Sequence, residues 1–248
     1  MRKKTWLSWS SGKDSAWALH VMRQSGEHEV AGLFTTINSA FDRVAMHAVR
    51  TKLLRQQALA IGLPLHLIEI PYPCSDAQYA AVMADFMARA GNNGVRCMAF
   101  GDLFLQDVRR YREGRMQGTG IEPVFPLWQR PTRELLAEML TGGLRAILTC
   151  VDPKVMSAEF AGRELTLELL ESMPSGMDPC GENGEFHTFV FDGPMFAQPL
   201  DIEVGEAVER DGFVFADCWL RGMRNLRESP EPGTKGNELS ERQFRLRS

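Results

Sequence analysis

The sequence lacks the cysteine patterns of a disulfide framework or a zinc site. Its 248 residues include five cysteines, at positions 74, 97, 150, 180 and 218, and none of them belongs to a C-x-x-C pair. An odd number of widely spaced cysteines argues against a disulfide-stabilised fold and against a cysteine-rich metal site. Chemistry that depends on a cysteine pair is therefore disfavoured.

Long apolar runs and an excess of one charge are missing as well. No stretch approaches the roughly 18 apolar residues of a membrane span, and residues 5–10 are too short and polar a stretch for a signal peptide. Lys and Arg number 28 against 32 Asp and Glu, a net charge of −4, which disfavours strong nucleic-acid binding. We expect a cytoplasmic protein with no membrane partner.

What the sequence does contain is an alternation of strand and helix patterns over the first 150 residues. Short apolar stretches predict strands, and longer stretches with apolar residues three or four positions apart predict helices. The expected strands cover residues 5–9, 30–37, 65–70, 97–100 and 146–151, and the expected helices cover residues 13–24, 45–61, 76–90, 103–114 and 132–140. This alternation predicts an α/β fold with a parallel sheet, helices on both faces, and a ligand site beyond the carboxyl ends of the strands.

After about residue 172 the pattern changes. Three short β-prone segments, residues 186–191, 200–208 and 212–220, are separated by Asp192-Gly193-Pro194 and Asp211-Gly212, which are hairpin signals. We expect a main α/β domain over residues 1–150, a small β-rich domain over residues 151–224 and a disordered tail over residues 225–248.

The most informative segment is the turn S-S-G-K-D-S at residues 10–15, between the first expected strand and the first expected helix. Small side chains let backbone N–H groups approach an anion, and the helix dipole favours negative charge at that end. Lys13 adds a cation, and the hydroxyls of Ser10 and Ser15 add donors. The turn therefore predicts a phosphate site.

This turn differs from a Walker A loop. Leu7 stands where the first glycine of that loop is needed, and Asp14 directly follows Lys13 where Ser or Thr is needed. By spacing alone, a second interpretation is equally open, in which Ser10 and Ser11 simply cap the helix while Lys13 and Asp14 are exposed.

The same turn resembles the Ser-Gly-Gly-Lys-Asp-Ser signature of the PP-loop, or N-type, ATP pyrophosphatases. The resemblance implies cleavage of ATP between its α and β phosphates, with release of pyrophosphate and an adenylated intermediate. Ser11 stands where glycine is usual, which suggests a backbone that a residue other than glycine tolerates. The resemblance assigns the following residues to the binding of the phosphates: Ser10, Ser11, Gly12, Lys13, Asp14 and Ser15. It also implies a bound Mg²⁺, with Asp14 as a ligand of the ion.

A second dense cluster of polar residues lies in the glycine-rich segment 178–189. Two carboxylates, an amide, an imidazole and a hydroxyl fall within seven residues: Glu182, Glu185, Asn183, His187 and Thr188. Along a strand that begins near residue 185, Glu185, His187 and Phe189 would share one face and offer acid–base groups to a substrate. The alternative is a polar glycine-rich loop with His187 bonded to the backbone.

The stretch G-E-N-G-E-F-H-T at residues 181–188, after a PP-loop domain of this length, resembles the diphthine–ammonia ligase family and its bacterial relatives. Residues 101–113 and Pro126-Leu127-Trp128 are similar to that family too, so the resemblance covers roughly residues 5–225. It implies a HUP-type α/β domain followed by a small α+β domain that helps to shape an acceptor site.

The chemistry that the resemblance implies is AMP-forming amide synthesis. A substrate carboxylate attacks the α-phosphate of ATP, and ammonia then displaces AMP. ATP, Mg²⁺, ammonia and a carboxylate acceptor of unspecified identity are the expected cofactors and partners, and a homodimer is one expected state. The catalytic candidates are Lys13, Glu182, Glu185 and His187, and the acceptor-binding candidates are Asn183 and Thr188. The roles of the three acid–base candidates stay undivided.

Further candidates follow from their positions. Gly101 and Asp102 come directly after the fourth expected strand, so we expect them near the nucleotide or the acceptor, with a helix cap as an equal alternative. Thr35 ends the second expected strand, where the superfamily holds adenine. The arginines at 109, 110 and 112 are candidates to bind an anion, although a solvated helix face accounts for at least two of them.

Two other functions stay open at this point. One is a PP-loop enzyme of another class, such as tRNA thiolation, and the other is an ATP-binding or ATP-hydrolysing protein without ligase activity. Sulfur transfer commonly uses a cysteine pair, so the cysteine pattern favours the ligase.

Overall fold

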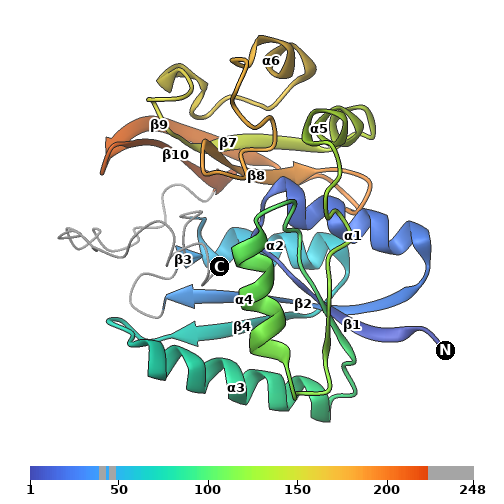
Figure 1. Ribbon diagram of the computed structural model, residues 1–248. Coiled ribbons are helices and arrows are strands. Elements are labelled where there is room, and N and C mark those ends of the chain that lie inside the picture. The colour runs from blue at the N-terminus through green and yellow to red at the C-terminus, as the bar shows by residue number, and fades with distance from the viewer. Residues whose placement is uncertain (39–42, 45–48, 223–248) are drawn as a thin grey trace.

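The computed structural model describes residues 1–38, 43–44 and 49–222. The expected tail at residues 225–248 and the first residues of the helix expected over 45–61 lie outside the described residues. Within the described part of the chain, no helix is long and apolar enough to cross a membrane. Two sheets form the framework (Figure 1).

The first sheet contains the strands expected in the first 100 residues. Its parallel strands follow the order β4-β2-β1-β5-β6, and β3 joins β2 in antiparallel orientation. The strands are β1 (Lys3–Ser8), β2 (His28–Asn38), β3 (Arg43–Val44), β4 (Leu65–Ile70), β5 (Cys97–Ala99) and β6 (Glu122–Val124). The expected α/β class is confirmed. The strand order reverses between β1 and β5, so the switch point lies at the carboxyl ends of these two strands.

Helices cover both faces of this sheet. They are α1 (Lys13–Ser25), α2 (Thr51–Ile61), α3 (Asp76–Asn92) and α4 (Gln106–Met116). Because side chains alternate along a strand, Trp6 points toward α3 while Leu7 points toward α1 and α2. Local signals set the helix ends: left-handed Gly26 and Gly62 end α1 and α2, and Ser75 begins α3 with a capping box.

The second sheet is antiparallel, with the order β8-β7-β10-β9. Its strands are β7 (Arg145–Val151), β8 (Phe186–Asp192), β9 (Ile202–Arg210) and β10 (Phe213–Leu220). The strand expected over residues 146–151 therefore exists as β7, but its expected place in the parallel sheet is wrong. A run of apolar residues predicts a strand without specifying which sheet it joins.

Only one of the two hairpin signals forms a hairpin. Asp211 and Gly212 link β9 to β10 with positive φ angles of 52° and 80°, as a two-residue turn of a right-twisted hairpin requires. The turn at Asp192-Gly193-Pro194 does not form one, because β8 pairs with β7 and not with β9.

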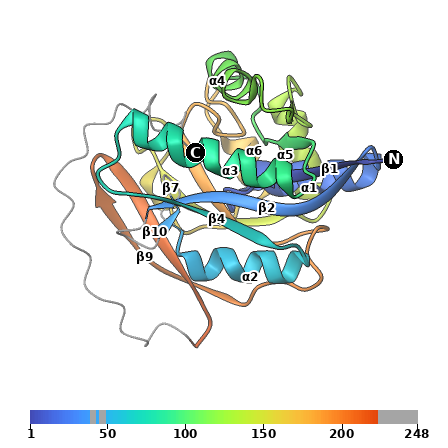
Figure 2. The ribbon, with the colours of Figure 1, turned by 90° about the horizontal axis from the view of Figure 1, so that it is seen from below.

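The helices α1 and α2 lie between the two sheets, and one apolar core runs through all three layers (Figure 1). Leu7 of β1, Trp17 of α1, Leu54 of α2 and Phe189 of β8 belong to the same buried cluster. The remaining helices are α5 (Thr132–Thr141), a 3-10 turn (Ala158–Phe160) and α6 (Leu167–Ser172). Figure 2 views the molecule from the α3 side of the first sheet. This layering brings β8 next to the amino end of α1.

Candidate active site

A cavity lies at the carboxyl ends of β1 and β5, at the switch point of the parallel sheet. It brings together the turn at residues 10–15, the segment after β5, part of α4 and the loop that leads into β8. The predicted residues that line it are Ser10, Gly12, Lys13, Asp14, Ser15, Gly101, Asp102, Glu182, His187 and Thr188. The two polar clusters of the sequence therefore meet in one cavity.

The turn at residues 10–15 is tightly closed before α1 begins. Ser10 Oγ and Ser15 Oγ lie 3.2 Å apart, and Ser15 Oγ donates to the carbonyl oxygen of Gly12 at 3.0 Å. Gly12, and neither Ser10 nor Ser11, is the N-cap of α1, so the interpretation of these serines as helix caps is wrong. A Cβ on Gly12 would lie 3.2 Å from Thr188 O, so the glycine permits the close approach of β8.

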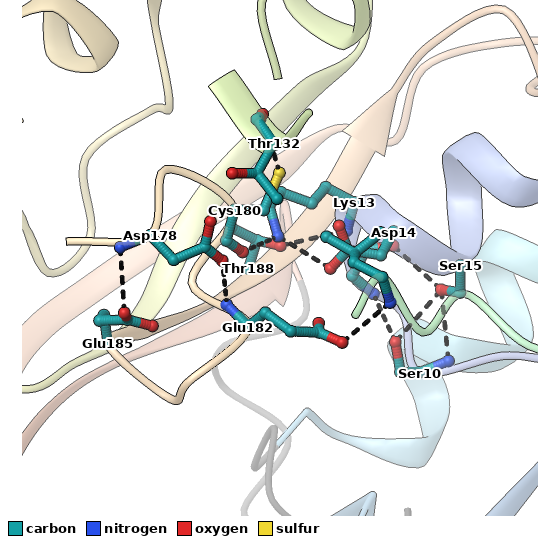
Figure 3. Close-up of polar contacts among 12 residues, drawn as sticks. Ser10, Lys13, Asp14, Ser15, Thr132, Asp178, Cys180, Glu182, Glu185 and Thr188 are labelled. Atoms are coloured by element: carbon teal, nitrogen blue, oxygen red, sulfur yellow. Dashed lines mark hydrogen bonds and ion pairs between the residues drawn. The ribbon is translucent and has the colours of Figure 1, made fainter. Parts of the chain in front are cut away.

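Lys13 is buried, with 3% of its surface exposed. Its Nζ donates to Asp14 Oδ2 at 2.8 Å and to the carbonyl oxygen of Cys180, and its backbone N–H donates to Thr188 Oγ1 at 3.1 Å (Figure 3). Burial lowers the pKa of Lys13, but attraction to Asp14 and neighbouring groups outweighs this effect, so the net shift is upward. Lys13 is thus a fixed cation that links α1 to the loop before β8.

Ser11 adopts a backbone conformation that favours glycine. Its φ angle is +71°, and its side chain is fully buried with no hydrogen-bond partner for Oγ among the described residues. The backbone expected to tolerate a residue other than glycine is therefore one that favours glycine, and Ser11 adopts it at a cost in conformational energy. A left-handed conformation costs about 1–2 kcal/mol in a residue with a Cβ, and an unsatisfied buried hydroxyl adds to the cost.

We expect Ser11→Gly to raise the free energy of unfolding by about 1 kcal/mol, because it relieves the backbone and removes the buried hydroxyl. Thermal and urea unfolding measure the change. Ser11→Ala is the matched control, since it removes the hydroxyl but keeps the Cβ. A glycine variant no more stable than the alanine variant contradicts the assigned backbone cost.

Glu182 is held at the cavity by backbone contacts. Its Oε1 accepts the N–H of Leu103 at 2.9 Å, and its own N–H donates to Asp178 Oδ2 at 2.8 Å. Burial, reinforced by the negative charge of Asp14, raises the pKa of the Glu182 carboxyl to about 8. A carboxyl group with this pKa can take up or release a proton near neutral pH.

We expect the raised pKa of Glu182 to make the ligand-free protein less stable as the pH rises from about 5 to 8. In this window the folded state keeps a proton that the unfolded state has released, so folding must take up a proton and becomes less favourable as the pH rises. Glu182→Gln removes the titrating carboxyl group. The free energy of unfolding of this variant, relative to that of the parent protein, should therefore increase with pH by up to about 1.4 kcal/mol per pH unit. Urea unfolding across this range measures the difference, and parallel curves for the two proteins contradict the assignment.

Glu185 and Asn183 lie outside the lining of the cavity. The Glu185 carboxylate accepts the N–H groups of Asp178 and Asn183 at 3.1 and 2.9 Å and the side-chain amide of Asn183 at 3.0 Å. Figure 3 shows Glu185 on the far side of the loop from Lys13. Because β8 begins at Phe186, Glu185 precedes the strand and closes the loop instead of sharing a strand face with His187.

The segment after β5 joins the cavity through Gly101 and Asp102. A Cβ on Gly101 would lie 2.9 Å from the backbone of Asp14, so glycine lets this segment pack on the first turn of α1. Asp102 is not a helix cap, because α4 begins at Gln106 and Asp102 instead forms a two-point ion pair with Arg112.

Thr35, predicted to bind the nucleotide, lies neither in the turn at residues 10–15 nor in the segment after β5. It is buried in β2 opposite Leu67 of β4 and does not line the cavity. Its assignment rested on the end of the strand expected near residue 37, and the cavity lies instead at β1 and β5.

Gln57 supports the site and was not predicted from the sequence. Its fully buried side chain accepts Trp9 Nε1–H at 2.8 Å and donates to the carbonyl oxygens of Ser11 and Val190 at 3.1 and 2.6 Å. One amide therefore ties together the end of β1, the turn at residues 10–15 and β8. A signal was present: Gln57 is four residues after buried Leu53, so it is a polar residue on the apolar face of α2.

A serine- and glycine-containing turn at a helix N-terminus, at the switch point of a parallel sheet, defines a nucleotide-binding α/β protein of the PP-loop class. Two family models match the chain: the diphthamide synthase N-terminal domain over residues 3–117 and the diphthamide synthase C-terminal domain over residues 131–217. The chain belongs to the diphthamide synthase family.

Curated relatives named diphthine–ammonia ligase match part of the chain. The proteins of Rattus norvegicus and Danio rerio are 34% and 35% identical over 119 residues, and the protein of Homo sapiens is 30% identical over 120 residues. Each match covers 45% of this chain, and 44%, 46% and 44% of the respective relative. The matched region thus spans less than half the length of these relatives.

Proposed function

We propose that the protein is an ATP-dependent, AMP-forming ligase that converts a carboxylate into an amide with ammonia. The observation that carries this proposal is that one cavity joins the proposed phosphate turn, residues 10–15, to Glu182 and His187. The names of the relatives, diphthine–ammonia ligase, support the same reaction class.

In the first proposed step, a carboxylate oxygen forms a bond to the α-phosphorus of ATP and the bond to pyrophosphate breaks. Pyrophosphate gains negative charge as it leaves, so Lys13 and the positive end of α1 stabilise it most in the transition state. In the second step, the ammonia nitrogen forms the C–N bond, the acyl C–O bond breaks, and AMP leaves with the electron pair. The proton that ammonia loses passes to Glu182, whose pKa of about 8 suits this role.

Mg²⁺ is part of the proposal, and Asp14 fits it. One oxygen of this carboxylate binds Lys13, while Oδ1 is buried with no hydrogen-bond partner in the described part of the chain. Mg²⁺ in such enzymes is held by one or two carboxylates together with phosphates, and when bound it neutralises phosphate charge. The described residues contain no group of three or more His, Cys, Asp or Glu side chains that could hold a metal ion unaided.

The chemistry of the thiols favours the ligase over sulfur transfer. Cys150, Cys180 and Cys218 are buried, and burial raises the pKa of Cys150 and Cys218 to about 12 and also raises that of Cys180. A thiol with a raised pKa is a poor nucleophile at neutral pH. These three cysteines are therefore unsuited to carrying sulfur.

The chain's organisation and location are proposals as well. We propose that its two units divide between residues 117 and 131, the gap between the matched domains, because β7 already belongs to the second sheet. A cytoplasmic location and a homodimer stay predictions from the sequence.

The test of the proposed function is product analysis with ATP, Mg²⁺, ammonium and a panel of organic carboxylates. We expect AMP and pyrophosphate in equal amounts, with an amide formed from one member of the panel. Formation of ADP and phosphate contradicts the proposal. Turnover that requires glutamine in place of ammonium contradicts the assignment of ammonia as the nitrogen donor.

A further inference from the structure

The part of the cavity formed by α4 and the segment that leads into it from β5 differs in chemistry from the part formed by the phosphate turn. Phe100, Leu105 and Val108 give it an apolar lining, and Arg112 adds one cation. The phosphate turn, by contrast, offers hydroxyls, backbone and Lys13. A polyphosphate suits the second environment, whereas an organic acid, with one charged and one apolar part, suits the first.

Arg112 is held rigidly in this wall. Its Nε and Nη2 donate to the two oxygens of Asp102 at 2.6 and 3.2 Å, and its guanidinium carbon lies 4.4 Å from the centre of the Phe100 ring. Only 13% of its side chain is exposed. Fixed on two sides in this way, the guanidinium loses little conformational freedom when it binds a ligand.

The hydrogen bonds of Arg112 leave donors for a ligand. A guanidinium carries five N–H groups, and none of the hydrogen bonds among the described residues uses Nη1. Arg112 and Glu182 both line the cavity. An acid bound at Arg112 would therefore be close to the group that we assign as proton acceptor.

We propose that Arg112 binds the carboxylate of the acceptor, and that the acceptor is an organic acid whose apolar part contacts Leu105 and Val108. This assignment rests on the proposed function and adds a substrate class to it. Asp102 acts as a positioning residue, because it orients Arg112 without contacting the acid. Arg110, which is exposed on the same helix, has no such role.

The test is carboxylate-dependent exchange of labelled pyrophosphate into ATP, with acetate, butyrate, hexanoate and benzoate as probes. We expect the parent protein to support exchange with at least one apolar acid. Arg112→Gln should raise the KM for that acid by about 10- to 100-fold, the usual effect of losing one charged hydrogen bond, with the KM for ATP unchanged. Arg110→Gln is the matched control and should change neither value.

The outcomes separate the assignment from the function. If folded Arg112→Gln shows an equal rise in the KM for the acid and the KM for ATP, or no rise in either, the role of Arg112 is overturned. Exchange by the parent protein would in that case still support the ligase proposal. No exchange with any acid overturns the ligase proposal and this assignment with it. If thermal unfolding shows that Arg112→Gln is not folded, Leu105→Glu serves instead, because it places a competing carboxylate at the half-buried wall. An unchanged KM for the acid in that variant also overturns the assignment.

Discussion

Lys13→Met is expected to lower kcat/KM for ATP by about 100- to 1000-fold, the loss seen when one preorganised donor to a developing anion is removed. Lys13 is buried, keeps its charge through Asp14, and borders the same cavity as the N-terminus of α1. Methionine preserves most of the side-chain volume, so the change isolates the ammonium group. AMP formation, followed by chromatography at saturating ammonium, measures the effect.

The control for this variant has to separate chemistry from folding. Removing the ammonium group leaves the Asp14 carboxylate and the Cys180 carbonyl without their donor, so thermal unfolding must accompany the kinetics. Lys52→Met, at an exposed lysine of α2, should keep full activity. Full ATP turnover by folded Lys13→Met contradicts the assignment of the phosphate site.

The sequence was a good guide wherever a structure depends on neighbouring residues. The turn at residues 10–15, the glycine-terminated helices and the hairpin at Asp211-Gly212 all follow from local conformational preferences. The place of β7 could not be predicted in this way, because its partners β8 and β10 lie 35 or more residues further along the chain. Alternation predicted one more parallel strand where the chain begins a second sheet.

The same contrast, between local preferences and contacts made by distant parts of the chain, explains which site residues could be predicted. Residues near the ends of β1 and β5 were predicted because the edge of a parallel sheet is where ligands bind. The expected place of Glu185 on a strand face was wrong, because Glu185 precedes β8 and its carboxylate accepts hydrogen bonds from the loop. The pair Asp102–Arg112 could not be predicted, because the partners are ten residues apart and belong to a loop and a helix.

The remaining large effect concerns the support of the phosphate turn. Gln57→Leu is expected to lower the free energy of unfolding by about 2–5 kcal/mol, because the indole N–H of Trp9 loses its acceptor and the carbonyls of Ser11 and Val190 lose a donor in a fully buried place. Urea unfolding measures the loss. Gln56→Leu, one residue earlier on a half-buried face, is the matched control and should cost under 1 kcal/mol.

Gln57→Glu tests the hydrogen bonds of the Gln57 side chain while keeping its size and shape. Glutamate has nearly the same volume and can still accept from Trp9, but its ionised form cannot donate to the Ser11 and Val190 carbonyls. Protonation restores one donor, so the variant should be closer in stability to the parent at pH 5 than at pH 8. Since the same amide sets the position of Ser11, ATP affinity should weaken even at temperatures where the variant is folded. Unchanged affinity there would mean that Gln57 stabilises the core without shaping the phosphate turn.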